Sequence, residues 1–154
     1  MERSMSPFRS SATQLAARMR RKPRAIDTII IGAGHAGLAM SAQLTRRTVE
    51  HVVLEAGDIG QRWRRERWDS LSLLSPNWMA RLPHYAYDGN DPDGFMTMAE
   101  FIRYLEDYAA SFDAPLVTGT TVELIERIDA DRLRISTDNG EWQARNLVVA
   151  TGFC

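Results

Sequence analysis

The sequence contains a single cysteine, Cys154, and nowhere shows the Cys/His spacing of a metal site. A disulfide framework is therefore excluded, and a cytoplasmic, reducing setting is expected. Hydrophobic runs are short, and none approaches the roughly 20 apolar residues that cross a bilayer. With 154 residues, 44% of them hydrophobic, the chain can form one domain with a core but not two full dinucleotide-binding domains.

The chain has little net charge, -1, but its charge is unevenly distributed. Residues 1–24 hold seven basic residues and one acidic residue, which leaves a net charge of -7 on the remainder. An acidic remainder argues against a nucleic-acid partner for the folded part. We expect residues 1–25 to be a basic, disordered tail, with an Arg-rich targeting or membrane-surface segment as the alternative, and residues 26–154 to be the folded domain.

An apolar run rich in isoleucine, residues 26–31, opens directly into a G-x-G-x-x-G motif. The run predicts a strand buried on both faces of a parallel sheet, and the residues from about 35 to 47 predict a helix. Gly32 permits the tight turn out of the strand, and Gly34 lets a pyrophosphate approach the backbone. Gly37 lets the helix pack against the strand, and the free amides at the start of the helix then hold the phosphates.

A second predicted strand, residues 51–54, ends at Glu55, which follows Gly37 by 18 residues. In a βαβ unit this position faces the adenosine ribose. A carboxylate there can accept hydrogen bonds from the ribose hydroxyl groups. The same carboxylate repels a 2′-phosphate, so the position favours FAD or NAD over NADP. The alternative is a solvated glutamate at a strand end.

Residues 60–78 interleave arginines with Trp63 and Trp68. This composition fits a nucleic-acid patch, a loop around a flat anionic cofactor, or a loop whose tryptophans cover an apolar edge. Residues 71–74 suggest a short strand that Pro76 ends, and residues 80–97 have the composition of a loop.

The rest of the chain predicts one helix followed by strands. A capping box at Thr97 and Glu100 begins a helix that runs to about Ser111. A short strand is predicted at 116–117, and alternating patterns predict strands at 121–128 and 132–137. A hairpin turn at 138–140 leads to a strand at 141–144, and a last apolar strand follows at 146–150. The expected fold is α/β: a Rossmann-like domain with a parallel sheet and an inserted antiparallel β-meander.

Several motifs occur together in this chain: the glycine loop, Glu55, the Gly60-x-x-Trp63 turn with residues 67–71, the 75–77 Ser-Pro-Asn segment, and the closing 148–152 Val-Val-Ala-Thr-Gly. The combination resembles the N-terminal half of the flavin-containing monooxygenase family and its bacterial relatives, the single-chain FAD/NADPH oxidoreductases. The resemblance covers about residues 26–154.

The resemblance implies FAD as the cofactor. The residues that it assigns to FAD are Gly32, Gly34, His35, Ala36, Gly37, Glu55, Trp63, Asn77, Val122, Ala150, Thr151 and Gly152. Trp63 would lie beside the ribityl–pyrophosphate stretch, Val122 would contact adenine through its backbone, and Asn77, the one catalytic candidate, would lie near the reactive edge of the flavin ring. In the family, NADPH reduces the flavin, and a small-molecule amine, sulfide or carbonyl compound is oxygenated.

The sequence departs from the family in two ways. Gln61 replaces a common second glycine, and no second glycine loop or 2′-phosphate site for NADPH is present. We therefore expect the FAD-binding portion of an oxidoreductase, without the NADPH domain and the returning C-terminal part. The alternatives are a truncated, inactive flavoprotein fragment that binds FAD weakly or not at all, and an NAD-dependent dehydrogenase. The tryptophan turn and the β-meander argue against the dehydrogenase. The oligomeric state stays open.

Overall fold

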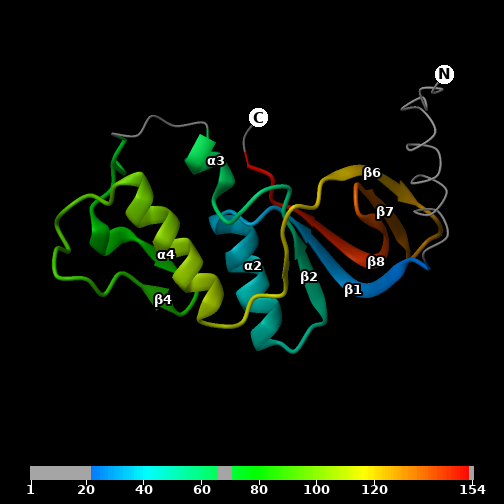
Figure 1. Ribbon diagram of the computed structural model, residues 1–154. Coiled ribbons are helices and arrows are strands. Elements are labelled where there is room, and N and C mark those ends of the chain that lie inside the picture. The colour runs from blue at the N-terminus through cyan, green and yellow to red at the C-terminus, as the bar shows by residue number, and fades with distance from the viewer. Residues whose placement is uncertain (1–21, 66–70, 153–154) are drawn as a thin grey trace, which may run out of the picture.

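A computed structural model describes residues 22–65 and 71–152 of the chain (Figure 1). Its elements, in order, are β1 (Arg24–Ile31), α2 (His35–Arg46), β2 (His51–Leu54), α3 (Gln61–Arg65), the 3₁₀-helix η1 (Asn77–Met79), β3 (Arg81–Leu82), β4 (Tyr85–Ala86), α4 (Met98–Ala110), β5 (Leu116–Val117), β6 (Val122–Arg127), β7 (Leu133–Thr137) and β8 (Gly140–Val149). Six strands form one sheet in the order β5-β2-β1-β8-β7-β6. The predicted α/β fold, a parallel sheet with an antiparallel meander, is confirmed.

The predicted tail lies almost wholly outside the described residues. Its last two members, Arg24 and Ala25, already belong to β1, so the strand begins two residues earlier than expected. Both pair with β8, Arg24 opposite Trp142 and Ala25 opposite Gln143, which explains the longer strand.

Strand β1 lies at the centre of the sheet, with β2 and β8 parallel to it on either side. Its side chains alternate between two cores. Ile30 belongs to the core under helices α2 and α4, and Ile29 belongs to the core that the meander covers. Because both faces are covered, the strand must be apolar at successive positions, as its sequence is. In Figure 1, α2 and α4 lie on one side of the strands and β6–β8 on the other.

A buried polar pair joins helix α2 to strand β2. Ser41 Oγ lies 2.8 Å from His51 Nε2, and His51 Nδ1 lies 2.8 Å from the carbonyl oxygen of Val49. A backbone carbonyl only accepts, so Nδ1 carries the proton, and Nε2 accepts from the serine hydroxyl. This histidine therefore has a structural role.

Strand β8 differs from the prediction, which divided it into residues 141–144 and 146–150. It is one continuous strand that closes the meander against β7 through residues 140–144 and pairs with β1 along residues 142–149. The polar dipeptide Arg145-Asn146 does not break it, because both side chains reach Asp27 on β1. Asn146 Nδ2 donates to Asp27 Oδ2 at 3.3 Å, and Arg145 Nη1 lies 4.0 Å from Asp27 Oδ1.

The region between α3 and α4 also differs from the prediction. The short strand expected at residues 71–74 is only an isolated bridge between Ser72 and Thr97. The 80–97 segment, expected to be loop, contains the two-stranded β3–β4 hairpin. Both strands are two residues long, too short for a periodic pattern to reveal them.

Helix α4 holds this region in place. The Thr97–Glu100 capping box is present, and its hydrogen bonds lower the pKa of Glu100. Burial, and then the neighbouring Tyr85 and Tyr108, raises the pKa of Tyr104 to about 12, so its hydroxyl remains protonated and donates to the carbonyl oxygen of Ala80 at 3.0 Å. The Tyr108 hydroxyl donates to the Pro83 carbonyl at 3.1 Å. In Figure 1 the β4 hairpin lies on the outer side of α4, away from α2.

The buried Ser41–His51 pair yields the first testable prediction. Ser41→Ala is expected to lower the free energy of unfolding by about 1–3 kcal/mol, because His51 Nε2 loses its partner inside the core. Urea unfolding followed by circular dichroism measures the change. Thr45→Ala on the same helix is the control and is expected to be neutral or slightly stabilising, since alanine is the better helix former. Equal stability of Ser41→Ala and the wild type would contradict the assigned hydrogen bond.

Candidate functional site

The glycine loop joins β1 to α2 at the carboxyl end of the parallel strands. Gly32 has φ +104°, and a Cβ atom on it would lie 2.5 Å from the carbonyl oxygen of Ala150. A Cβ atom on Gly37 would lie 1.9 Å from the carbonyl oxygen of Gly32. These two positions admit no side chain, so α2 begins directly against the end of β1, as the sequence predicted.

Gly34 differs from the other two glycines. A Cβ atom placed on it would meet nothing within 4 Å. It is the N-cap of α2 and has an ordinary φ of -83°. The fold therefore does not need glycine at this position, and the open space beside its Cα remains for a bound group.

The N-terminus of α2 is suited to an anion. Gly34 offers no side chain that could cap the helix, and the first turn holds no acidic residue. The exposed His35 and Ala36 occupy the first two helical positions. The amides of a first helical turn lack intrahelical partners and carry the positive end of the helix dipole. Together with the space at Gly34, this arrangement fits the diphosphate of a dinucleotide.

Glu55 lies at the end of β2, beside the glycine loop. Its Oε2 accepts the backbone N–H of Ala33 at 2.7 Å, and its Oε1 accepts that of Gly57 at 2.9 Å. The carboxylate thus braces the glycine loop, a function that sequence reasoning missed. Each oxygen has a second lone pair, so the same carboxylate can also accept ribose hydroxyl groups. The residues present therefore fit FAD at this end of the sheet.

Two further segments complete this edge of the sheet. Ala150 donates its N–H to the Ile31 carbonyl at 2.8 Å, and the exposed Thr151 and Gly152 follow it. Thr120 donates its N–H to the Glu55 carbonyl at 2.9 Å, which brings Val122, two residues further on, toward the same end of β2.

Trp63 lies on α3, a helix that the sequence did not predict. Its ring meets Phe101 of α4 edge to face, with centroids 5.2 Å apart, and it is half-buried there. Gly60, which precedes α3, donates its N–H to the Ala33 carbonyl at 3.3 Å, so α3 begins next to the glycine loop. The other predicted residues of this motif, 67–70, lie outside the described residues.

Asn77 lies in η1. It is 6% exposed, and its Nδ2 donates to the Asp91 carbonyl at 2.9 Å. Among the described residues, its buried Oδ1 has no hydrogen-bond partner. Buried amide oxygens are normally paired, so this oxygen is an exception within the described residues.

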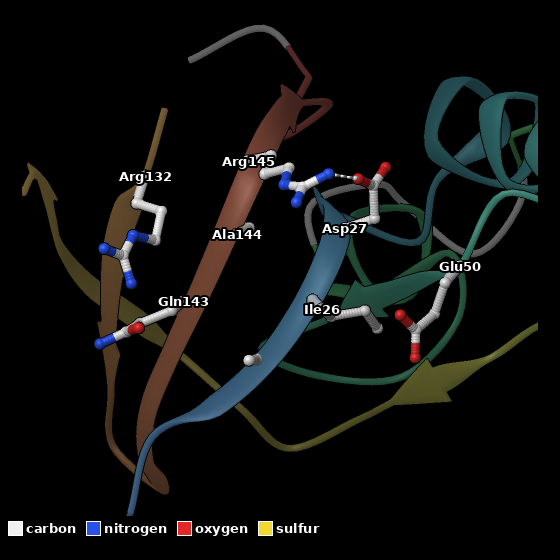
Figure 2. A pocket seen from close by; sticks show the side chains of 8 residues that line it. Ile26, Asp27, Glu50, Arg132, Gln143, Ala144 and Arg145 are labelled. Atoms are coloured by element: carbon white, nitrogen blue, oxygen red, sulfur yellow. Dashed lines mark ion pairs between the residues drawn. The ribbon is translucent and has the colours of Figure 1, made fainter. Parts of the chain in front are cut away.

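A cavity of about 480 Å³ lies away from this site, at the opposite end of β1 (Figure 2). Residues of β1 and β8 and the side chains of Glu50 and Arg132 line it. Three of its charged side chains lie near an opposite charge: Arg145 lies 4.0 Å from Asp27, and Arg132 Nε donates to Asp129 at 2.9 Å. Ligands of open parallel sheets bind at the carboxyl ends of the strands, so we place the functional site at the glycine loop.

Residues 22–65 and 71–152 contain no helix both long and apolar enough to cross a bilayer. In the same ranges, no three His, Cys, Asp or Glu side chains gather where they could hold a metal ion.

Known proteins resemble this chain in both sequence and fold. The profile of the family described as pyridine nucleotide-disulphide oxidoreductase matches residues 29–154. An uncharacterized CzcO-like oxidoreductase of Geobacillus kaustophilus is 39% identical over 128 residues, which are 82% of this chain and 36% of that protein. The probable indole-3-pyruvate monooxygenase YUCCA4 of Arabidopsis thaliana is 39% identical over 126 residues, 80% of this chain and 30% of that protein.

A solved flavin-containing monooxygenase from Stenotrophomonas maltophilia has a TM-score of 0.74 at 28% identity, over 84% of this chain and 39% of that chain. The chain thus spans about a third of the length of the curated relatives it matches. These matches confirm the resemblance to flavin-containing monooxygenases. The chain belongs to the pyridine nucleotide-disulphide oxidoreductase family.

Proposed function

We propose that this chain, over residues 26–154, is the FAD-binding portion of a flavin-dependent, NADPH-using oxidoreductase of the monooxygenase type. The observation that carries the proposal is the contrast among three glycines. Gly32 and Gly37 are closed by backbone contacts, whereas Gly34 opens onto space at the uncapped start of α2. If all three glycines served only close packing, a Cβ atom on Gly34 would also collide with neighbouring atoms, and it does not.

Each group of the site has a separate task in this proposal. The α2 amides and the space at Gly34 hold the diphosphate, and the Glu55 carboxylate accepts the ribose hydroxyl groups. Val122 lies on the adenine side, and Trp63 and Ala150–Gly152 border the middle of the cofactor. Asn77 would lie at the flavin end. FAD, when bound, would supply the electron-transfer chemistry.

The hydride donor, NADPH, needs a binding site of its own, which the described residues do not form. Residues 22–65 and 71–152 contain one glycine-rich phosphate loop, and Glu55 beside it disfavours the 2′-phosphate of NADPH. We propose that a nicotinamide-binding part of the kind carried by the longer relatives supplies the NADPH that would reduce the flavin, which with O2 would oxygenate a small amine, sulfide or carbonyl compound. A cytoplasmic location completes the proposal, since one cysteine in 154 residues suits a reducing compartment.

FAD titration, followed by quenching of flavin fluorescence, tests the site through two glycine variants. Gly34→Ala is expected to weaken FAD binding about tenfold or more, because the methyl group occupies the space at the phosphate loop, while stability falls by less than about 1 kcal/mol. Gly37→Ala is expected to lose several kcal/mol of stability, since its Cβ would collide with the Gly32 carbonyl.

Failure of the wild-type chain to bind FAD would favour the alternative, a protein of this family without flavin binding. If the Gly34→Ala protein is stably folded and binds FAD as tightly as the wild type does, FAD does not bind at this loop.

Glu55→Gln gives a separate test of the ribose site. The carboxylate uses one oxygen for each of its two backbone N–H donors, and the NH2 group of glutamine cannot accept a hydrogen bond, so one donor loses its partner and stability is expected to fall by about 1–3 kcal/mol. The preference for ADP-ribose over its 2′-phosphate should narrow, because the repelling charge is gone. Calorimetric titration with both ligands measures this preference.

Glu126→Gln is the matched control, because Glu126 is exposed and lies 3.6 Å from Arg134. It should change stability by less than about 1 kcal/mol and leave the ligand preference intact. An unchanged preference in Glu55→Gln would remove Glu55 from the ribose site.

A further inference from the structure

Residues 55–61 form the loop that leads from Glu55, at the end of β2, to the start of α3. The backbone holds one side of this loop, because the Gly57 carbonyl accepts the N–H of Gly119 at 3.3 Å. The loop contains two glycines, Gly57 and Gly60. Glycine leaves the backbone many conformations, so a loop of this composition needs further contacts to keep one shape.

The side chain of Gln61, the first residue of α3, supplies these contacts. Its Oε1 accepts the N–H of Asp58 at 3.2 Å, and its own backbone N–H donates to the Asp58 carbonyl at 3.0 Å. The same side chain lies against Gly57, since a Cβ atom on that glycine would be 2.5 Å from Gln61 Cδ. Gly57 does not have a positive φ, so the Gln61 side chain, rather than the backbone conformation, excludes a larger residue there. Gln61 therefore fixes residues 57 and 58 together.

The position of Gly57 bears on the candidate site because its N–H donates to Glu55 Oε1 at 2.9 Å. This bond and the one from the Ala33 N–H to Oε2 together orient the carboxylate.

We infer that Gln61 is a positioning residue: by holding Gly57, it keeps the Glu55 carboxylate in the orientation that accepts the ribose hydroxyl groups of an adenosine-containing ligand. The inference rests on the proposed function. Because the loop is ordered before the ligand arrives, less conformational entropy is lost on binding. Gln61 does not itself need to touch the ligand, since it acts through Gly57 and Glu55.

Two nucleotides of equal charge, ADP and 2′-deoxy-ADP, test this role by calorimetric titration into the full chain. The ratio of their dissociation constants measures the contact of one ribose hydroxyl group with Glu55, because effects on the phosphates or on adenine cancel in it. The wild type is expected to bind ADP about tenfold more tightly, the effect of one hydrogen bond to a charged acceptor. Gln61→Ala should reduce the ratio to about threefold or less, since alanine favours the helix but leaves Gly57 without its contact.

Two further variants and a control separate this role from a general effect on the loop. Gly57→Ala should also reduce the ratio, although Gln61 is unchanged, because the new methyl group displaces the Gln61 side chain. Gln61→Glu should keep the wild-type ratio, since a carboxylate oxygen also accepts the Asp58 N–H and its charge acts equally on both nucleotides. Gln43→Ala on α2 is the matched control: Gln43 Oε1 accepts from Arg47 Nη1 at 2.7 Å, and its loss should leave the ratio unchanged.

Amide hydrogen exchange, followed by NMR, gives a second measurement that needs no ligand. In Gln61→Ala the amides of Gly57 and Asp58 should exchange about tenfold faster than in the wild type, because the loop opens more often. Thermal melts check that all variants fold.

A wild-type nucleotide ratio in both Gln61→Ala and Gly57→Ala overturns the inference, and so does unchanged exchange of the Gly57 amide. Equal binding of the two nucleotides by the wild type also overturns it, because Glu55 then does not contact the ribose. A separate FAD titration of the wild type distinguishes the two failures. FAD binding with an unchanged ratio contradicts the role of Gln61 alone, whereas absence of FAD binding contradicts the proposed function.

Discussion

The contact between the first turn of α2 and the end of β1 is the constraint on which the site depends. A side chain at Gly37 would overlap the carbonyl oxygen of Gly32, and a side chain at Gly32 would overlap that of Ala150. Without these side chains, the start of a helix and the ends of two parallel strands reach the same small region. The partial positive charge of α2 is thereby brought to the strand ends, where Gly34 leaves space.

Glu55 connects this arrangement to the next strand and gives one carboxylate two tasks. It accepts backbone N–H groups from Ala33 and Gly57, so it shapes the loop on which a diphosphate would rest. In the proposed function it also accepts ribose hydroxyl groups. Binding and local stability are therefore coupled at this residue, whereas at Gly34 they are separable because the fold tolerates a methyl group there. Gln61 secures the turn that follows Glu55, through its contacts with Gly57 and Asp58.

Local patterns predicted the parts of the fold that have strong periodicity or definite turn chemistry. The apolar run of β1, the capping box of α4 and the hairpin at residue 140 were all recognisable, since each follows from a few neighbouring residues. The β3–β4 hairpin and α3 were missed because they are too short for a period. The continuity of β8 was missed because the polar pair Arg145-Asn146 is stabilised by Asp27, which lies more than a hundred residues earlier.

The sequence by itself determined that a strand, a glycine turn and a helix follow one another in the pattern typical of a dinucleotide-binding loop, with an acidic residue at the end of the following strand. Glycine spacing and apolar runs are local properties of the chain, so no tertiary contact is needed to read them. Only the tertiary structure decided which glycine is open and that Glu55 braces the loop. These facts depend on contacts between segments up to 118 residues apart, Gly32 against Ala150 among them, and no spacing along the chain specifies such contacts.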